Sequence, residues 1–545
     1  MVKEKKKSSF INDSFISIFG VVACKVIGLL YVIPFYAMIS TAGGALYSYA
    51  YSIYTLFLSL STSGIPAAMS KIISEYNSLG YNNTKIKVYK IGLSIMMILG
   101  IVGFILMMVF APQLAHMLIG NMKGGNSISD IAFVIRIISS ALLIVPMLSV
   151  TKGYFQGQKM FKQAAWSNVI EQVARVAFLL IGCYLCIYKF KIDEKFAIAV
   201  AVFSATIGAI AAYLYLYYKK RKNKEIFSVM TKDKKEEKGL DKKTLAKQII
   251  ACAVPFIVID LLKSAYGMVD SLTVVRGMTY MGYSAEVSEL ALSTFATWGA
   301  KLTMIVISIS MGLTTSLIPN IASDNIKGDH DKVNRKISLA IIMLLFITLP
   351  MTIGISFLAK PIWIIFYSYK EVSIDIFKLF IFTAASFAIY SVIINIAQTL
   401  NHTKQVLITL ATAFILNFIG NIPFMYLCHK LGMGAYQGAS ICTLITELLP
   451  ALYLLIYIKK KHNLKFKELT KNTFKIILCN LIMVVSLILL SQIITLNSLH
   501  KTSCMIEVLI YAFVGMIVYI IASYFAGLIK EIGEDRILKK LRLKS

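Results

Sequence analysis

Long runs of apolar residues, almost free of charge, recur along the whole sequence and constrain its fold more than any other feature. A helix that crosses a bilayer needs about 20 consecutive apolar residues, whereas barrel strands are short and alternate in polarity. The runs here are long and do not alternate, so they predict transmembrane helices. We predict fourteen spans, near 12–37, 44–70, 86–112, 128–151, 163–187, 196–218, 246–275, 286–318, 336–359, 373–399, 404–428, 434–458, 472–496 and 505–529.

The composition agrees with this interpretation and excludes several other classes of protein. Hydrophobic residues make up 58% of the 545 residues and charged residues 15%. Soluble domains are about 45–50% apolar and about 25% charged. A soluble enzyme, a disordered chain and a secreted disulfide scaffold are therefore excluded, and an all-α polytopic membrane protein is expected.

The formal net charge of +29 has two opposite explanations. Such a charge is typical of a protein that binds nucleic acid, or of a membrane protein that keeps its basic residues on the cytoplasmic side. About 41 of the 56 basic residues fall in the two tails and in alternate loops, all on one side of the predicted bilayer. We therefore expect a multi-pass protein of the bacterial cytoplasmic membrane, with both termini cytoplasmic and no nucleic-acid partner.

A weak internal repeat suggests how the spans are grouped. Gly64 and Gly80 have counterparts at the same offset in Gly312 and Gly328, and each pair flanks the end of a second span. Because six spans separate the copies, the two halves have parallel orientation. The predicted organisation is an N-lobe with spans 1–6 at 1–218, a charged cytoplasmic linker at 219–245, a C-lobe with spans 7–12 at 246–458, and spans 13–14 with a basic tail at 459–545.

Motifs of catalysis and metal binding are missing from the sequence. It contains no P-loop and no H-E-x-x-H motif, and its eight cysteines are scattered. We therefore expect a transporter rather than an enzyme, with no cofactor and no structural metal. Its driving force would be an ion gradient, the membrane potential or the substrate gradient.

A few charged residues lie near the predicted bilayer midplane, where a charge is costly and usually faces a cavity. Lys25 in span 1 and Lys301 in span 8 have no acidic residue three or four positions away. We interpret both as cations that face a cavity. If the lobes face each other, the two lysines converge on one anionic group, and lysine suits a phosphate.

Two further charged pairs allow two interpretations each. Glu171 and Arg175 in span 5 are spaced i,i+4, and Asp260 and Lys263 in span 7 are spaced i,i+3. Each pair is either an ion pair within its own helix or part of a binding site. Lys263 is a candidate third ligand for the anionic group, and Asp260 a candidate for ion coupling.

Several motifs resemble the YtgP/MurJ-type lipid flippases, a family related to MATE drug exporters, Wzx-like polysaccharide flippases and stage V sporulation protein B. The motifs are Gly64–Pro66 with Ser70–Asn77 at the end of span 2, Lys152–Gly157 with Val169–Val176, and Ser316–Pro319. The resemblance implies a two-lobe, V-shaped bundle with alternating access. The implied substrate is an undecaprenyl-diphosphate-linked saccharide, above all the peptidoglycan precursor lipid II, with spans 13–14 forming a groove for its prenyl tail.

The resemblance also implies roles for individual residues. Lys25 and Lys301 match positions of cavity arginines that serve the diphosphate, whereas Tyr31 matches a further cation of the family. Asp270, Asn417 and Asn421 partially match a sodium site found in some relatives. Coupling to Na⁺, to H⁺ or to the membrane potential is therefore expected.

Other functions are weighed on the same residues. An exporter of another lipid-linked polysaccharide repeat unit fits the same cations. A MATE-like cation-coupled drug exporter prefers an acidic, aromatic cavity and about twelve spans. A membrane glycosyltransferase needs acidic or histidine clusters on a sizeable outer loop, and the predicted outer loops are short. A passive scaffold would not need charges at the midplane. The expected partners are a lipid-linked saccharide and the bilayer, and the expected oligomeric state is a monomer.

Overall fold

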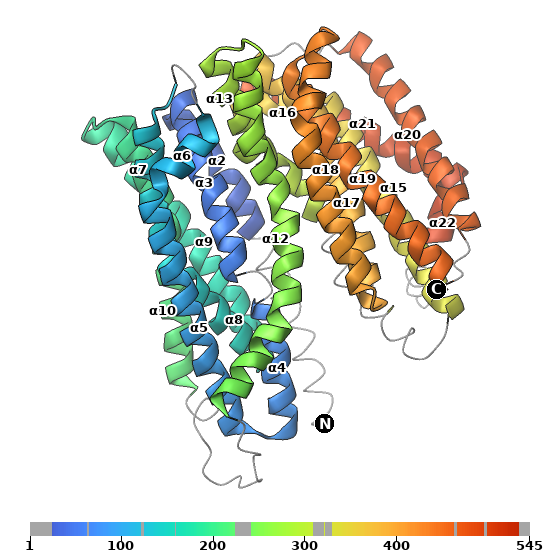
Figure 1. The fold of residues 1–545 in the computed structure, drawn as a ribbon. Helices are drawn as coiled ribbons and strands as arrows, with labels where there is room; N and C mark the ends of the chain where they lie inside the picture. Colours follow the sequence, from blue (N-terminus) through green and yellow to red (C-terminus); the bar gives the residue numbers. More distant parts are fainter. Residues whose placement is uncertain are drawn as a thin grey trace. The chain divides into compact units, whose positions relative to one another are not determined.

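The computed structural model describes residues 24–62, 65–120, 125–158, 160–223, 241–308, 321, 330–462, 466–494 and 499–533. In these residues the regular secondary structure is entirely helical (Figure 1). Contacts divide the chain into two compact units. The first comprises the described residues up to Thr279 together with Tyr283–Ser293, and the second comprises Tyr280–Gly282 and the described residues from Thr294 onward.

The first unit is a bundle in which α9 packs on α10, and α4 packs on α8 and α5. Its helices are α2 (Val32–Met38), α3 (Thr41–Thr62), α4 (Ile65–Leu79), α5 (Asn82–Val109), α6 (Ala111–Ile119), α7 (Ile128–Ser139), η1 (Ser140–Leu143), α8 (Val145–Gly157), α9 (Phe161–Tyr184), η2 (Leu185–Lys189), α10 (Glu194–Lys222), α12 (Lys242–Tyr280) and α13 (Ala285–Ser293).

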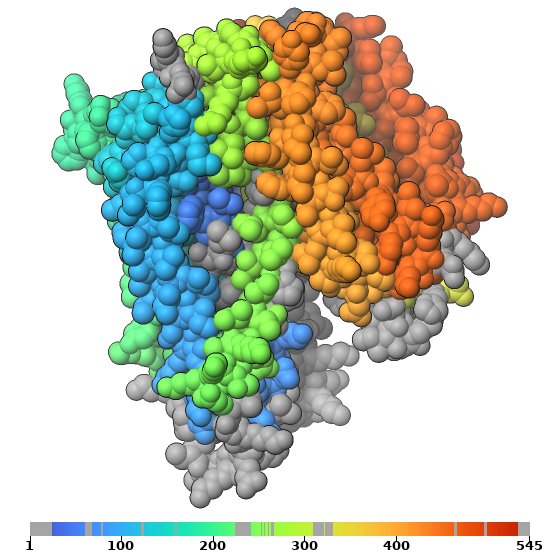
Figure 2. Space-filling model, in the orientation of Figure 1, coloured from blue at the N-terminus to red at the C-terminus, as the bar shows by residue number. Residues whose placement is uncertain are grey.

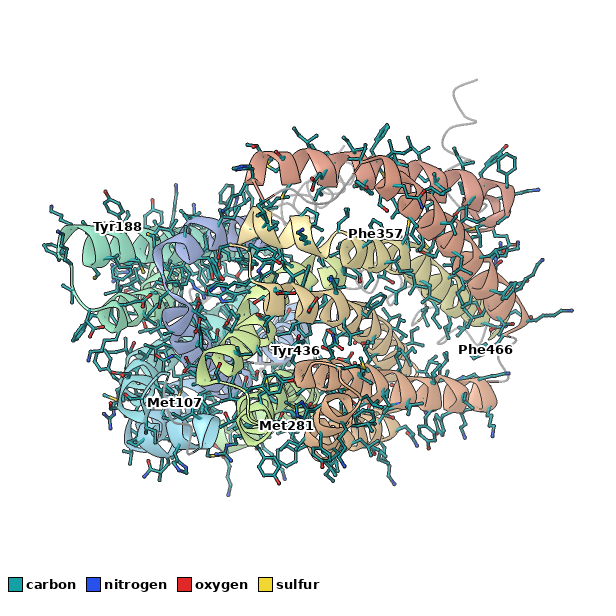
Figure 3. The ribbon with its side chains drawn as sticks, turned by 90° about the horizontal axis from the view of Figure 1, so that it is seen from above. Met107, Tyr188, Met281, Phe357, Tyr436 and Phe466 are labelled. Atoms are coloured by element: carbon teal, nitrogen blue, oxygen red, sulfur yellow. The ribbon has the colours of Figure 1, made fainter. Side chains whose placement is uncertain are left out.

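The second unit is built around α17, which packs on α15 and α19, while α19 also packs on α18. Two apolar helices, α20 and α21, pack on each other. Phe357, labelled in Figure 3, lies at the end of α15. Its ring centroid is 5.9 Å from that of Tyr511 on α21. The helices are η3 (Thr294–Trp298), α15 (His330–Phe357), α16 (Ala359–Phe366), α17 (Glu371–Thr399), α18 (Thr403–Lys430), α19 (Ala435–His462), α20 (Lys467–Ile493), α21 (Lys501–Phe525) and α22 (Leu528–Gly533).

Eleven helices of the described chain are long and apolar enough to cross a membrane, which confirms a multi-pass helical protein. They are Asn82–Val109, Ile128–Gly157, Lys162–Lys189, Glu194–Lys222, Ala285–Ser308, Asp331–Phe357, Glu371–Thr399, Thr403–Lys430, Ala435–His462, Lys467–Ile493 and Lys501–Phe525. Each overlaps a predicted span. The predicted spans at 44–70 and 246–275 overlap α3 and α12. The first predicted span overlaps the shorter apolar helix Cys24–Met38. The count of fourteen and the lobe boundaries stay predictions.

Helix α5 shows how these helices divide their surface between protein and lipid. Gly92, Met96, Gly100, Gly103 and Met107 are buried, and their spacing of three or four residues places them on one face. The other face exposes large apolar side chains, and Figure 2 shows α5, in blue, along the outer surface of the first unit. An apolar exterior with small residues at the contacts is typical of helices packed in a bilayer.

Gly438 of α19 packs closely against the backbone of α18. A Cβ atom there would overlap the carbonyl oxygen of Phe424 and the backbone of Met425. By contrast, a Cβ atom on Gly354 of α15 would meet no heavy atom within 4 Å.

We therefore expect Gly438→Val to lower the free energy of unfolding by about 1–3 kcal/mol, because the side chain would force the two helices apart. The measurement is thermal unfolding of the purified protein in detergent. Gly354→Ala is the matched control and should be neutral or stabilising, since alanine favours a helix over glycine by about 0.5–1 kcal/mol. Equal stability of the two variants would contradict the close packing of α18 on α19.

Candidate functional site

A cluster of charged residues in the first unit is centred on α9. Lys152, near the end of α8, places its Nζ atom 2.7 Å from Oε2 of Glu171, and the two side chains are 17% and 30% exposed. The guanidinium of Arg175 donates from Nη2 to the hydroxyl of Tyr51 on α3. Glu171 and Arg175 therefore bind different neighbouring helices, rather than forming the ion pair within α9 that was one of the two interpretations.

Arg175 is held by aromatic rather than acidic side chains. Its Cζ atom lies 5.2 Å from the ring centroid of Tyr51, within the range of a cation–π contact. Tyr51 packs on Tyr47 with ring centroids 4.5 Å apart, and the hydroxyl oxygens of Tyr47 and Tyr31 are 3.4 Å apart. These partners are neutral, so the described partners of Arg175 leave its positive charge uncompensated.

Lys25 belongs to the same neighbourhood. It is half-buried in the helix Cys24–Met38, which packs on α9. The thiol of Cys24 lies close enough to Glu171 and Lys152 to feel their charges. A Cβ atom on Gly28 would lie 3.2 Å from Nε2 of Gln172. The start of this helix therefore lies beside the ion pair.

The charged side chains described in this cluster carry more positive than negative charge. They are the cations Lys25, Lys152 and Arg175 and the carboxylate of Glu171. Lys152 was assigned to a cytoplasmic loop by its sequence position, and its pairing with Glu171 was missed. An arrangement with a surplus of positive charge in a half-buried site is suited to binding an anion, as lysine and arginine do with phosphate groups.

Lys301 lies in the second unit, just after a distortion of its helix. The helix Ala285–Ser308 contains the π-helix η3, and the carbonyl of Trp298 accepts a hydrogen bond of 2.8 Å from the hydroxyl of Tyr367. Thr294 also donates to Ser373 at 3.0 Å. π-Helical turns often occur at functional sites, and here the turn fixes the backbone directly before the half-buried Lys301.

Buried amides lie between α18 and α19 of the second unit. Asn417 and Asn421 are fully buried, and Nδ2 of Asn417 donates to Thr443 and Thr446 at 3.1 Å each. The Oδ1 atom of Asn417 is buried and accepts no hydrogen bond from the described residues. Hard cations prefer such oxygen ligands, so this group fits a small cation. The described residues contain no group of three or more His, Cys, Asp or Glu side chains that fits a metal.

The remaining predicted site residues lie on α12. Asp270 is buried in the first unit, next to Ser271, whose hydroxyl lies 2.7 Å from that of Ser52. Asp260 and Lys263 are part of the continuous helix α12, but their side chains lie outside the described ones. The roles of Asp270, Asn417 and Asn421 as one ion site stay a prediction.

The chain is similar to known families of membrane proteins. Residues 10–282 match the family described as Polysaccharide biosynthesis protein, and residues 255–427 match the MatE family. The chain is 30% identical to lipid II flippase MurJ of Bacillus subtilis (strain 168), over 96% of this chain and 97% of the relative. It is 22% identical to stage V sporulation protein B of the same organism, over 58% of each chain.

Solved structures agree on the fold. Lipid II flippase MurJ in an inward closed conformation superimposes with a TM-score of 0.68 at 18% identity, over 95% of this chain and 99% of that one. An inward-facing multidrug MATE transporter of the MOP superfamily superimposes with a TM-score of 0.64 at 14% identity, over 84% of this chain and 99% of that one. The chain thus belongs to the MurJ family of lipid II flippases, membrane transporters with a MATE-like fold rather than enzymes.

Proposed function

We propose that this protein moves an undecaprenyl-diphosphate-linked saccharide, lipid II, across the cytoplasmic membrane by alternating access. The observation that carries the proposal is the surplus of positive charge around α9, where the described partners of Arg175 are neutral tyrosines. A diphosphate needs such cations once it leaves water. The 30% identical relative named lipid II flippase supports the choice of substrate.

The proposal includes the finer architecture predicted from the sequence. Fourteen spans form two parallel lobes and two additional helices, both termini are cytoplasmic, and the protein acts as a monomer. Lys25 and Lys301, one from each lobe, bind the diphosphate with Arg175 and Lys263, while Glu171 orients Lys152. Substrate binding shifts the population between inward-open and outward-open states.

The diphosphate site is tested by removing its cations. Lys25→Ala and Lys301→Ala are each expected to lower lipid II translocation at least about tenfold, because each removes a charge-assisted contact worth about 1.5–3 kcal/mol. The measurement is rescue of flippase-depleted cells combined with a lipid II accessibility assay.

Controls separate charge from folding. Lys25→Arg should retain activity, and Lys162→Ala, at an exposed position of α9, should behave as the unchanged protein. All variants should reach normal membrane levels. Full activity of both alanine variants would overturn the diphosphate site, and rescue without a change in lipid II exposure would favour another lipid-linked saccharide.

An apolar cavity between α20 and α21 supports a groove for the prenyl tail. Its volume is about 470 Å³ and it is lined by Leu478, Cys479, Ile482, Val518, Ile521, Ala522, Phe525 and Ala526. A branched hydrocarbon chain gains free energy by leaving water for such a surface, at about 25 cal/mol per Å².

We expect Ala522→Trp to fill this cavity and to slow translocation of lipid II with its full-length tail, while a short-tailed analogue moves at the normal rate. The measurement is translocation in proteoliposomes with both substrates. Ile520→Trp, at an exposed position of α21 outside the cavity lining, is the control. Equal slowing of both substrates by Ala522→Trp would count against a tail groove.

We further propose that transport is coupled to a cation bound near Asn417. The buried Oδ1 atom that accepts no hydrogen bond from the described residues supports this proposal, together with the neighbouring hydroxyls of Thr443 and Thr446. Sodium is the first choice, because its ligands are oxygen atoms. A proton or the membrane potential alone is the alternative.

Translocation should therefore rise in a Na⁺ gradient and not in an equal K⁺ gradient. Asn417→Ala should abolish this difference, because it removes the amide oxygen, while leaving the rate without sodium unchanged. The assay uses proteoliposomes at clamped membrane potential. Identical rates in Na⁺ and K⁺ would refute sodium coupling, and inhibition by a protonophore would then favour the proton.

A further inference from the structure

A carboxylate on α13 holds the segment that leads into α7. Glu289 is 2% exposed, and its Oε1 atom accepts hydrogen bonds from the backbone N–H of Asn126 at 2.8 Å and from Nδ2 at 3.0 Å. Nδ2 of Asn126 also donates to the carbonyl of Ala42, next to the start of α3, at 2.9 Å. Glu289 thus ties three parts of the first unit together.

The C-terminal turn of α6 is held by α12. Nη2 of Arg276 donates to the carbonyl of His116, in the last turn of α6, at 2.8 Å. A cation is favourable at a helix C-terminus, where carbonyl groups lack partners within the helix. The end of α6 is therefore held by α12, and Asn126, just before α7, is held by α13.

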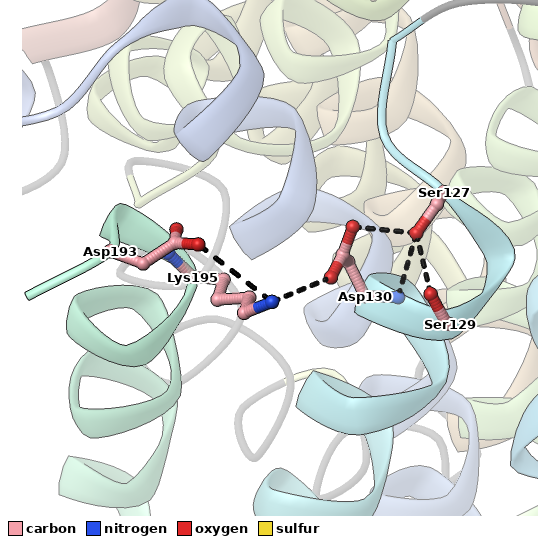
Figure 4. Close-up of polar contacts among 5 residues, drawn as sticks. All are labelled: Ser127, Ser129, Asp130, Asp193 and Lys195. Atoms are coloured by element: carbon pink, nitrogen blue, oxygen red, sulfur yellow. Dashed lines mark hydrogen bonds and ion pairs between the residues drawn. The ribbon is translucent and has the colours of Figure 1, made fainter.

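The carboxylates near the start of α7 and α10 bind other partners than Glu289 does. Asp130 and Asp193 lie 3.6 and 3.7 Å from Nζ of Lys195, and Ser127 caps α7 by accepting from the N–H of Asp130 (Figure 4). Glu194 accepts from the backbone and the hydroxyl of Ser40.

Glu289 differs from these carboxylates, because within the described part of the chain no cation lies within ion-pair distance of it. The titratable group that faces it from α3 is Tyr49. The Tyr49 hydroxyl is itself buried and has no hydrogen-bond partner among the described residues. The side chain of Lys123 lies outside the described residues.

We propose that Glu289 is a proton-binding residue and that protonation releases the segment that it holds. An ionised carboxylate accepts charge-assisted hydrogen bonds that are about twice as strong as neutral ones. Burial opposes the ionised form where no cation compensates it. Burial and these hydrogen bonds therefore act in opposite directions on the ionised form, and binding of one proton weakens both bonds from Asn126.

The consequence for transport rests on the proposed function. In the predicted topology this end of the first unit faces outward, so a proton arrives from outside and returns there. The proton then regulates opening of the outer end and is not carried across the membrane. The binding of the proton itself does not depend on which substrate is moved.

The test is hydrogen exchange of the Asn126 amide in nanodiscs without substrate, corrected for the intrinsic effect of pH. We expect protection to fall about tenfold as the pH is lowered, which corresponds to about 1.4 kcal/mol, the difference between a charge-assisted and a neutral hydrogen bond. Glu289→Gln, a neutral acceptor of similar shape, should give the low protection at every pH. Glu286→Gln, at an exposed position of the same helix, is the control and should match the unchanged protein.

An infrared band of a protonated carboxyl, present at low pH and missing in Glu289→Gln, is the second expected result. Protection that does not change with pH, with no such band, would overturn the proposal. A Lys123→Gln variant as weakly protected as Glu289→Gln would also overturn it, in favour of an ion pair. Failure of the lipid II assays would leave these measurements unaffected, so the two proposals fail separately.

Discussion

Hydrocarbon offers no partner to a backbone N–H or C=O group, and the rest of the structure follows from this constraint. Each long segment satisfies its backbone within one helix. Hydroxyl groups do the same, because Ser48 donates to the carbonyl of Gly44, and Thr348 to that of Leu344, each one turn away at 2.8 Å. Polar side chains that bind a neighbouring helix instead, such as Arg175 and Asn417, mark where the helices do something other than pack.

The sequence predicted the helices well because a span depends on local composition alone. Each of the eleven apolar helices overlaps a predicted span. Helices α3 and α12 also overlap predicted spans, and α3 carries the polar residues Tyr47, Tyr51 and Ser52. Tyr51 accepts a hydrogen bond from Arg175, and the hydroxyl of Ser52 lies 2.7 Å from that of Ser271. The polar residues that interrupt the apolar pattern of α3 are thus the ones that make its polar contacts inside the first unit.

The contacts of the candidate site were less predictable, because they join helices that are distant in the sequence. The spacing of Glu171 and Arg175 places them on one face of a helix. It does not show whether they pair with each other or with residues of other helices. Glu171 pairs with Lys152 across helices, and Lys152 looked like a loop residue. The π-helix before Lys301 was also missed, since one extra residue in a turn leaves no mark in an apolar run.

The partner of a buried cation decides what that cation is able to bind. A carboxylate cancels its charge and competes with any anionic ligand, as Glu171 does for Lys152. Tyrosine hydroxyls and rings stabilise Arg175 without cancelling its charge, because they supply lone pairs and a ring quadrupole. The guanidinium then stays oriented and attractive to an anion. The tyrosines of α3 therefore keep a costly charge inside the protein while leaving it available for a phosphate group.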